Sequence, residues 1–82
     1  MNDGQLMGEL TAVFRDIFDN DAIEIAPTMT ARDIKNWDSL NHINLIVAVE
    51  KRFGVKFTTK EIAGLADVGS LISLVQHKVN RT

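Results

Sequence analysis

The sequence predicts an all-α fold, a four-helix bundle with a short third helix and a long loop between the first and second helices. Two observations support this prediction. Apolar residues recur three and four positions apart in several stretches, whereas no stretch alternates apolar and polar residues over the length of a strand. Residue types that cap helices precede these stretches, and we expect the caps at Asp3, Asp38, Thr58 and Asp67.

The first helix is expected to begin at Asp3 and to end at the polar segment 19–21. Its apolar residues form one stripe that faces a core: Leu6, Leu10, Val13, Phe14 and Ile17. Residues 19–37 form a long connection, in which Thr30 and Asp33 are expected to start a short helical turn. We expect this connection to be ordered because apolar residues pin it over the helices, namely Ile23, Ile25, Met29, Ile34 and Trp37.

The stretch from Trp37 to Phe53 is the central element, an amphipathic helix opened by Asp38 and closed by Gly54. At about 100° per residue it has two apolar stripes, whereas a surface helix of a small domain normally has one. The stripe that faces the core consists of Leu45, Ile46, Val49 and Phe53, with His42 above it. The second stripe lies on nearly the opposite side, where it is free to face a partner, and consists of Leu40, Ile43 and Val47.

Two shorter patterns complete the bundle. Thr58 and Glu61 form a capping box, which opens a short helix that Gly64 stops. Asp67 caps the last helix, whose apolar stripe contains Leu71, Ile72, Val75 and Val79. His77 and Lys78 are expected to be solvated near its C-terminus, where the helix dipole favours cations.

Length and composition limit the class of protein. The 82 residues make one domain, 1–82, and 45% apolar with 24% charged residues is typical of a globular chain. A net charge of −2 argues against a nucleic-acid binder, and the absence of cysteine removes disulfides and cysteine-ligated metal sites. No apolar run approaches the ~20 residues of a membrane span, and the N-terminus lacks the form of a signal peptide. We therefore expect a cytoplasmic monomer with no metal site and no membrane contact.

Ser39 is the residue whose position requires a functional explanation. It follows Asp38 at the first position of the central helix, where backbone N–H groups lack partners and the helix dipole is positive. This environment favours an anion, especially a phosphate. A serine at this position is suited to carrying a phosphodiester, because the charge of the phosphodiester is already partly compensated.

The run Asp38-Ser39-Leu40, followed by an apolar helix with Glu50 and Phe53, resembles the acyl carrier protein family. The likeness covers nearly the whole chain and implies a bundle of the acyl-carrier type. It also implies that Ser39 carries 4′-phosphopantetheine, transferred from coenzyme A by a separate phosphopantetheinyl transferase with a metal ion, and that Asp38 assists. The thiol of this group would hold acyl or aminoacyl intermediates as thioesters and pass them between transferring and synthase enzymes. The chain itself is then not an enzyme.

Further site residues follow from the same resemblance and the second stripe. We expect partner enzymes to bind one face of the central helix, at Leu40, Ile43, Asn44, Val47 and Lys51. Part of the cargo is expected between the second and third helices, in an acyl pocket of Ile46, Val49, Ile62 and Leu65. Housekeeping fatty-acid carriers of the family have a strongly acidic second helix that docks on basic patches of enzymes. Here Glu50 is the only acid on that helix after Asp38, which favours a specialised pathway of the polyketide, modified-lipid or aminoacyl kind.

Two other interpretations use the same residues. A hydrolase triad of Ser39, His42 and Asp38 lacks the Gly-x-Ser-x-Gly elbow that exposes a catalytic serine, so no catalytic residue is expected. A helical protein-interaction module without a covalent group would use the face of Leu40, Ile43 and Val47, and it is the alternative function. Trp37 either anchors the loop or belongs to the docking face.

Overall fold

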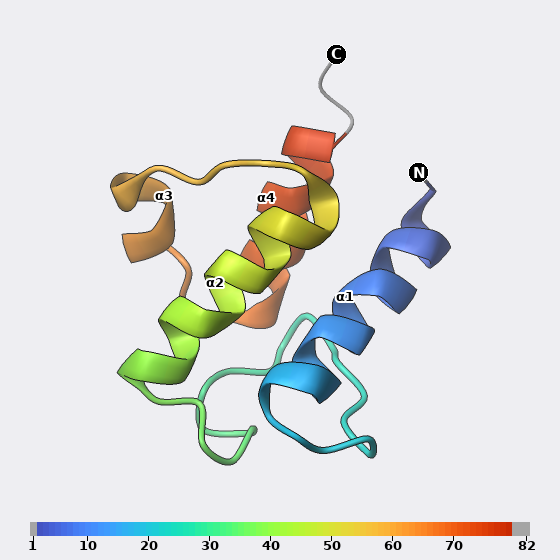
Figure 1. Ribbon diagram of the computed structural model, residues 1–82, viewed down its shortest axis with the longest axis vertical. Coiled ribbons are helices and arrows are strands. Elements are labelled where there is room, and N and C mark those ends of the chain that lie inside the picture. The colour runs from blue at the N-terminus through green and yellow to red at the C-terminus, as the bar shows by residue number, and fades with distance from the viewer. Residues whose placement is uncertain (1, 80–82) are drawn as a thin grey trace.

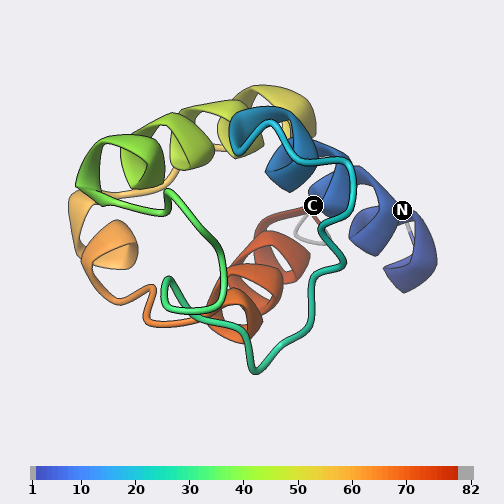
Figure 2. The same ribbon diagram turned by 90° about the horizontal axis from the view of Figure 1, so that it is seen from below.

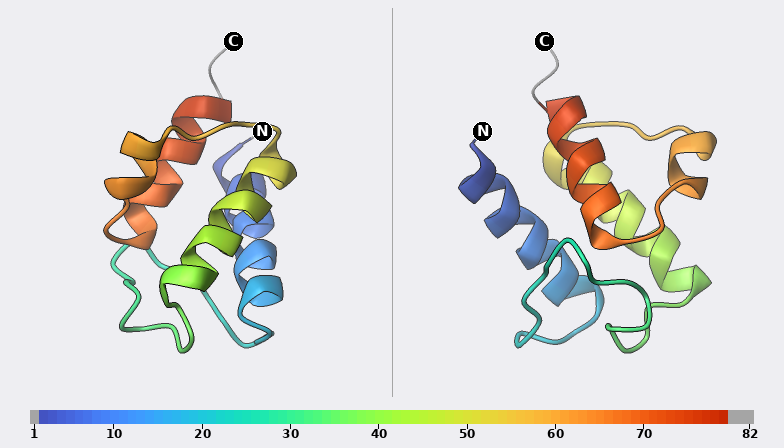
Figure 3. Two further views of the ribbon diagram at one scale, coloured as in Figure 1. Left: turned by 60° about the vertical axis from the view of Figure 1, so that its left-hand side comes forward. Right: turned by 180° about the vertical axis from the view of Figure 1, so that it is seen from behind.

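The computed structural model describes residues 2–79, and these residues form four helices (Figure 1). The helices are α1 (Asp3–Ile17), α2 (Ser39–Phe53), α3 (Thr59–Ala63) and α4 (Val68–Val79). The all-helical architecture with a short third helix is therefore confirmed. α1 and α2 lie side by side and run in roughly opposite directions, and α4 packs behind them (Figures 1 and 3). The short α3 lies on the far side of α2 from α1 (Figure 1).

The cap of the first helix lies one residue earlier than the sequence predicted. The side-chain oxygen of Asn2 accepts a hydrogen bond from the Gln5 N–H at 2.8 Å, and the Gln5 side chain accepts from the Asn2 N–H at 3.1 Å. This reciprocal pair satisfies two backbone donors at once, so the prediction of a cap at Asp3 is wrong by one position. The predicted caps at Asp38, Thr58 and Asp67 are confirmed by hydrogen bonds from backbone N–H groups to their side chains.

The core lies where the apolar stripes of α1, α2 and α4 meet. Its fully buried side chains include Leu10 and Phe14 of α1, Leu45 and Val49 of α2, and Val75 of α4. Burying one such side chain stabilises the fold by roughly 1.5–3 kcal/mol, so these stripes are what holds the helices together. Within residues 2–79, no helix combines the length and the apolar character that crossing a membrane requires.

The connection between α1 and α2 crosses the lower end of the bundle (Figure 2). Ile23 and Ile34 are buried, and Trp37 packs half-buried against the core, which confirms an ordered connection. Two backbone hydrogen bonds fasten it to the start of α4. The Val68 N–H donates to the Met29 carbonyl at 2.8 Å, and the Gly69 N–H donates to the Pro27 carbonyl at 2.9 Å. Further along the connection, residues 30–33 form the predicted single turn, which does not continue as a helix.

The segment after α2 is tied back to the bundle by side chains. Gly54 ends α2 in the left-handed conformation (φ 66°, ψ 37°), as predicted. The Glu50 carboxylate accepts a hydrogen bond from the Phe57 N–H at 2.8 Å. Lys78 of α4 pairs with Glu61 of α3 at 3.0 Å, and its ammonium lies 5.7 Å from the centre of the Phe57 ring. The expectation that Lys78 is merely solvated is therefore wrong, because this side chain links α4 to α3.

Candidate functional site: the first turn of α2

Asp38 sets the start of α2. Its backbone is extended (φ −103°, ψ −174°), its side chain accepts from the Asn41 N–H at 2.8 Å, and its carbonyl accepts from the His42 N–H at 2.8 Å. These bonds make Asp38 the residue before the helix and Ser39 the first residue within it. The carboxylate of Asp38 also satisfies one of the N–H groups that a helix start leaves unpaired.

A contact between two asparagines, Asn36 and Asn41, also positions this start, and sequence reasoning missed it. Asn36 has a left-handed backbone (φ 73°), and its carbonyl accepts from the Asn41 side-chain amide at 2.7 Å and from the Asp38 N–H at 2.9 Å. Through this bond the Asn41 side chain holds the turn that precedes Asp38. The available signal was Asn36 itself, because asparagine is enriched among residues with positive φ.

Ser39 lies at the exposed tip that this turn creates. Among the described residues, the N–H groups of Ser39 and Leu40 have no acceptor, whereas those of Asn41 and His42 are paired with Asp38. Two free donors therefore lie beside the Ser39 side chain, at the positive end of a helix of 15 residues. This donor set fits a phosphate joined to the serine oxygen, which would accept hydrogen bonds from the free N–H groups.

A shallow hollow of about 540 Å³ opens beside Ser39. It is lined by Asp38, Ser39, His42 and Ile43 of the helix start and by Ala31, Trp37 and Leu65. The Trp37 indole N–H donates to Nδ1 of His42 at 3.1 Å, so that nitrogen is engaged and does not contact the serine. The Asp38 carboxylate accepts a hydrogen bond from the Asn41 N–H instead of contacting the imidazole. A connected chain of serine, histidine and acid is thus missing among the described residues, and the arrangement is unlike a hydrolase triad.

The residues expected to form an acyl pocket are distributed between the core and the hollow. Ile46 (2% exposed) and Val49 (0%) lie in the core, and Ile62 and Leu65 are half-buried against it. Of these four, Leu65 lines the hollow beside Ser39. Of the two roles considered for Trp37, the structure supports that of a loop anchor. Its ring packs against Phe14 and Phe18, with centroids 5.6 and 5.9 Å away.

The second stripe of α2 is exposed. The exposed fractions are 70% for Leu40, 51% for Ile43 and 42% for Val47, and these are the exposed large apolar side chains of the described chain. Asn44 and Lys51, the other predicted partner-binding residues, are also exposed. A continuous apolar stripe therefore runs along α2 from the Ser39 end.

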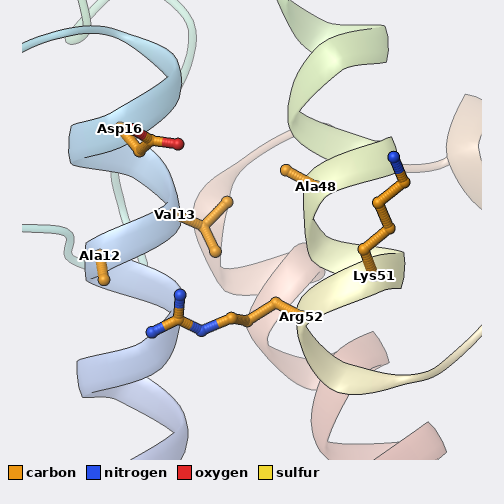
Figure 4. Close-up of a pocket in the computed structure, with 6 residues that line it drawn as sticks. All are labelled: Ala12, Val13, Asp16, Ala48, Lys51 and Arg52. Atoms are coloured by element: carbon orange, nitrogen blue, oxygen red, sulfur yellow. The ribbon is translucent and has the colours of Figure 1, made fainter.

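Arg52 belongs to the other side of α2. A second hollow, of about 610 Å³, lies between α1 and α2, and Arg52 reaches across it toward α1 (Figure 4). There its guanidinium pairs with Glu9. Arg52 is thus engaged within the chain, and Lys51 is the cation of the last helical turn that has no ion-pair partner among residues 2–79.

Comparisons with known proteins agree with this geometry. Residues 8–75 match the sequence profile of the family described as "Phosphopantetheine attachment site". An acyl carrier protein of Thermosynechococcus vestitus is 28% identical over 79 residues, covering 96% of this chain and 98% of the relative. A meromycolate extension acyl carrier protein of Mycolicibacterium aurum is 25% identical over 72 residues, covering 88% and 74%. The solution structure of a holo acyl carrier protein from Geobacter metallireducens matches with 43% identity and a TM-score of 0.86, covering 92% of this chain and 86% of that one.

The fold and the site define a carrier domain rather than an enzyme. The chain belongs to the acyl carrier protein family, whose members carry covalently bound 4′-phosphopantetheine and interact with synthases and transferases. The expected family, fold and cofactor are confirmed.

Proposed function

We propose that Ser39 is the residue that carries 4′-phosphopantetheine in this acyl carrier protein, within one carrier domain of residues 1–82. The observation that supports this most strongly is the environment of Ser39: an exposed hydroxyl at the first position of α2, next to two unpaired N–H groups. These donors and the helix dipole stabilise a phosphodiester at this oxygen.

The residues around Ser39 have distinct roles in this proposal. When bound, the prosthetic group supplies a thiol that holds acyl or aminoacyl groups as thioesters. Asp38 keeps the helix start in place and assists the modification, which a separate phosphopantetheinyl transferase performs. Ile43 and Leu65 offer an apolar wall to the beginning of the cargo, because they line the hollow beside Ser39. Ile46 and Val49 are buried in the core, and Ile62 packs half-buried against it, so longer cargo would enter between α2 and α3 only if these side chains separate.

We propose a specialised pathway rather than housekeeping fatty-acid synthesis. Glu50 is the only acid of α2 itself, and its carboxylate already accepts the Phe57 N–H. The exposed residues of α2 beside the stripe of Leu40, Ile43 and Val47 therefore include Asn44 and Lys51, whereas Glu50 is half-buried. The meromycolate carrier among the relatives, which by its name serves the extension of one particular lipid, agrees with a dedicated role. Acylation by housekeeping fatty-acid synthase enzymes at the rate of their own carrier would contradict this proposal.

The partners that this function implies are a phosphopantetheinyl transferase and the acyl- or aminoacyl-transferring and synthase enzymes of the pathway. The chain works as a monomer in the cytoplasm, binding each partner in turn. Such contacts are expected to bury less than about 1,200 Å², because a shuttle must dissociate quickly.

Intact-mass analysis tests the attachment site. The parent, Ser39→Ala and Ser73→Ala are incubated with coenzyme A and a broad-specificity transferase. Ser73 is exposed on α4 and serves as the matched serine control. We expect a gain of one phosphopantetheine on the parent and on Ser73→Ala, and none on Ser39→Ala. If the folded parent gains nothing under conditions that modify a control carrier, the unmodified protein-interaction module becomes the better interpretation.

A further inference from the structure

We propose that partner enzymes bring a carboxylate to the C-terminal end of the exposed α2 stripe, where it sits between Lys51 and Lys56 beside Val47. This inference rests on the proposed function, in that the same face of α2 is what partners bind. It specifies the chemistry of the partner surface, an apolar socket followed by an acidic side chain.

The apolar part of the recognition surface is the stripe itself. Leu40, Ile43 and Val47 follow one another at helical spacing, and Leu40 and Val47 are separated by roughly 10 Å along the helix axis. All three side chains are exposed, Leu40 the most and Val47 the least. An exposed apolar row of this kind on one helix is suited to a groove or socket in a partner.

The stripe continues directly into a hollow at the end of α2. This hollow has a volume of about 320 Å³ and is lined by Val47, Glu50, Lys51, Gly54, Val55 and Lys56. Val47 belongs both to the stripe and to the hollow, so the two form one continuous surface. A partner that covers the stripe therefore also reaches the two lysines.

The charge of this hollow is positive. Lys51 and Lys56 are exposed and form no ion pair among residues 2–79, whereas Arg52 is neutralised by Glu9 and Lys78 by Glu61. Glu50 is half-buried, and one of its carboxylate oxygens accepts a hydrogen bond from the Phe57 N–H. The combined positive charge of the two lysines is larger than the negative charge of Glu50 together with the roughly half-unit negative charge at the end of the helix.

Charge complementarity follows from this balance. A partner with a basic patch would bring like charges together at Lys51 and Lys56, and such contacts disfavour association. A partner carboxylate would instead complete two short ion pairs next to an apolar contact that excludes part of the water. The docking end of α2 thus selects for acidic partner surfaces and against the basic surfaces that acidic carriers bind.

The test uses a malonyl-CoA transacylase of housekeeping fatty-acid synthesis, whose carrier-docking patch is basic, and a variant in which the lysines and arginines of that patch are replaced by glutamate. All carrier variants are first converted to the holo form, and intact mass confirms the conversion. Each is then labelled with ¹⁵N and titrated with both transacylases without malonyl-CoA. Failure of the first step would count against Ser39 as the attachment site, whereas only the titration bears on the charge of the partner.

We expect the parent to bind the glutamate variant about fivefold more tightly than the basic transacylase, as two partly exposed ion pairs imply. The shifted amides should include Val47, Lys51 and Lys56. Lys51→Glu/Lys56→Glu should reverse the preference. The matched control Lys35→Glu/Lys60→Glu changes the net charge equally at exposed positions outside α2 and should retain it.

Three results would overturn the inference. They are equal or tighter binding of the basic transacylase by the parent, loss of the preference in the control variant to the same extent, and absence of binding to either transacylase.

Discussion

The indole N–H of Trp37 donates a hydrogen bond to Nδ1 of His42 at 3.1 Å, and the two rings are stacked with centroids 6.1 Å apart. Trp37 also packs against Phe14 and Phe18 of the α1 end. This one side chain therefore connects the core, the end of the long loop and the first turn of α2. Because Nδ1 accepts the bond, the neutral imidazole carries its proton on Nε2. The first turn that holds Ser39 is in this way fixed to the hydrophobic core.

Replacing Trp37 by phenylalanine should remove the hydrogen bond and keep most of the aromatic packing. We expect the free energy of unfolding to fall by about 1 kcal/mol, the usual contribution of one such bond. The ¹⁵N shifts of His42 should move from the Nε2-protonated pattern toward a mixture of tautomers. Urea unfolding and histidine-selective NMR measure the two effects. An unchanged tautomer pattern in Trp37→Phe would show that the indole does not hold the imidazole.

A glycine at the start of α4 is required by the loop that passes it. A Cβ added at Gly69 would lie 2.9 Å from the Pro27 carbonyl oxygen and 3.3 Å from the Pro27 Cβ. The same carbonyl accepts the Gly69 N–H at 2.9 Å. Gly69→Ala should therefore displace the connection from α4 and destabilise the fold by about 2 kcal/mol, although alanine is the better helix former.

Gly8 is the matched control for this substitution. It lies within α1, and a Cβ there meets no atom within 4 Å outside its own helix backbone and chain neighbours. Gly8→Ala should stabilise the fold by roughly 0.5–1 kcal/mol, because the helix gains propensity without a clash. Thermal unfolding of both variants compares them directly. Two changes of the same sign would contradict the close approach of Pro27 as the cause.

The difference between these two glycines shows what sequence reasoning could and could not predict. Helices, caps and core stripes depend on residues a few positions apart, so the ends of α2 at Asp38 and Gly54 were predicted correctly. The need for Gly69 could not be predicted in this way, because it comes from Pro27, 42 positions away in the chain. The contact of Lys78 with Glu61 and Phe57 was missed for the same reason.

The candidate site divides in the same way. Ser39 and its capping residue could be placed from the sequence because both lie within one helical turn. The role of Asn41 could not, because it depends on the left-handed turn at Asn36. Likewise, the sequence alone does not identify a partner for Arg52. Its pairing with Glu9 follows only from the packing of α1 against α2.

Glu61 should make the stability of the fold depend on pH in the acid range. The hydrogen bond from the Thr58 N–H, followed by the contact with Lys78, lowers the pKa of the Glu61 carboxyl below its ordinary value. Because its folded pKa lies below its unfolded pKa, the stabilisation is fully present above the unfolded value of about 4.3 and is lost as the pH falls through the lower folded pKa.

Glu61→Gln should consequently be less stable than the parent at neutral pH, with the difference shrinking as the pH falls below about 4. Urea unfolding followed by circular dichroism at several pH values measures this. Glu24→Gln is the control, because Glu24 is exposed and forms no hydrogen bond or ion pair within the described chain. A difference between Glu61→Gln and the parent that stays constant down to the acid limit would exclude the carboxylate charge as its source.

The exposed stripe of α2 should separate binding from folding. Leu40 is 70% exposed, so Leu40→Ala should change the free energy of unfolding by less than about 0.5 kcal/mol. Leu45 is 0% exposed on the opposite face, and Leu45→Ala should cost about 2–5 kcal/mol. In the proposed transferase reaction at Ser39, Leu40→Ala should lower kcat/KM about tenfold, as loss of a central apolar interface contact does. Equal kcat/KM values for Leu40→Ala and the parent would show that the transferase does not bind the part of the stripe next to Ser39. The exposed Leu40 side chain would then have no role in this step.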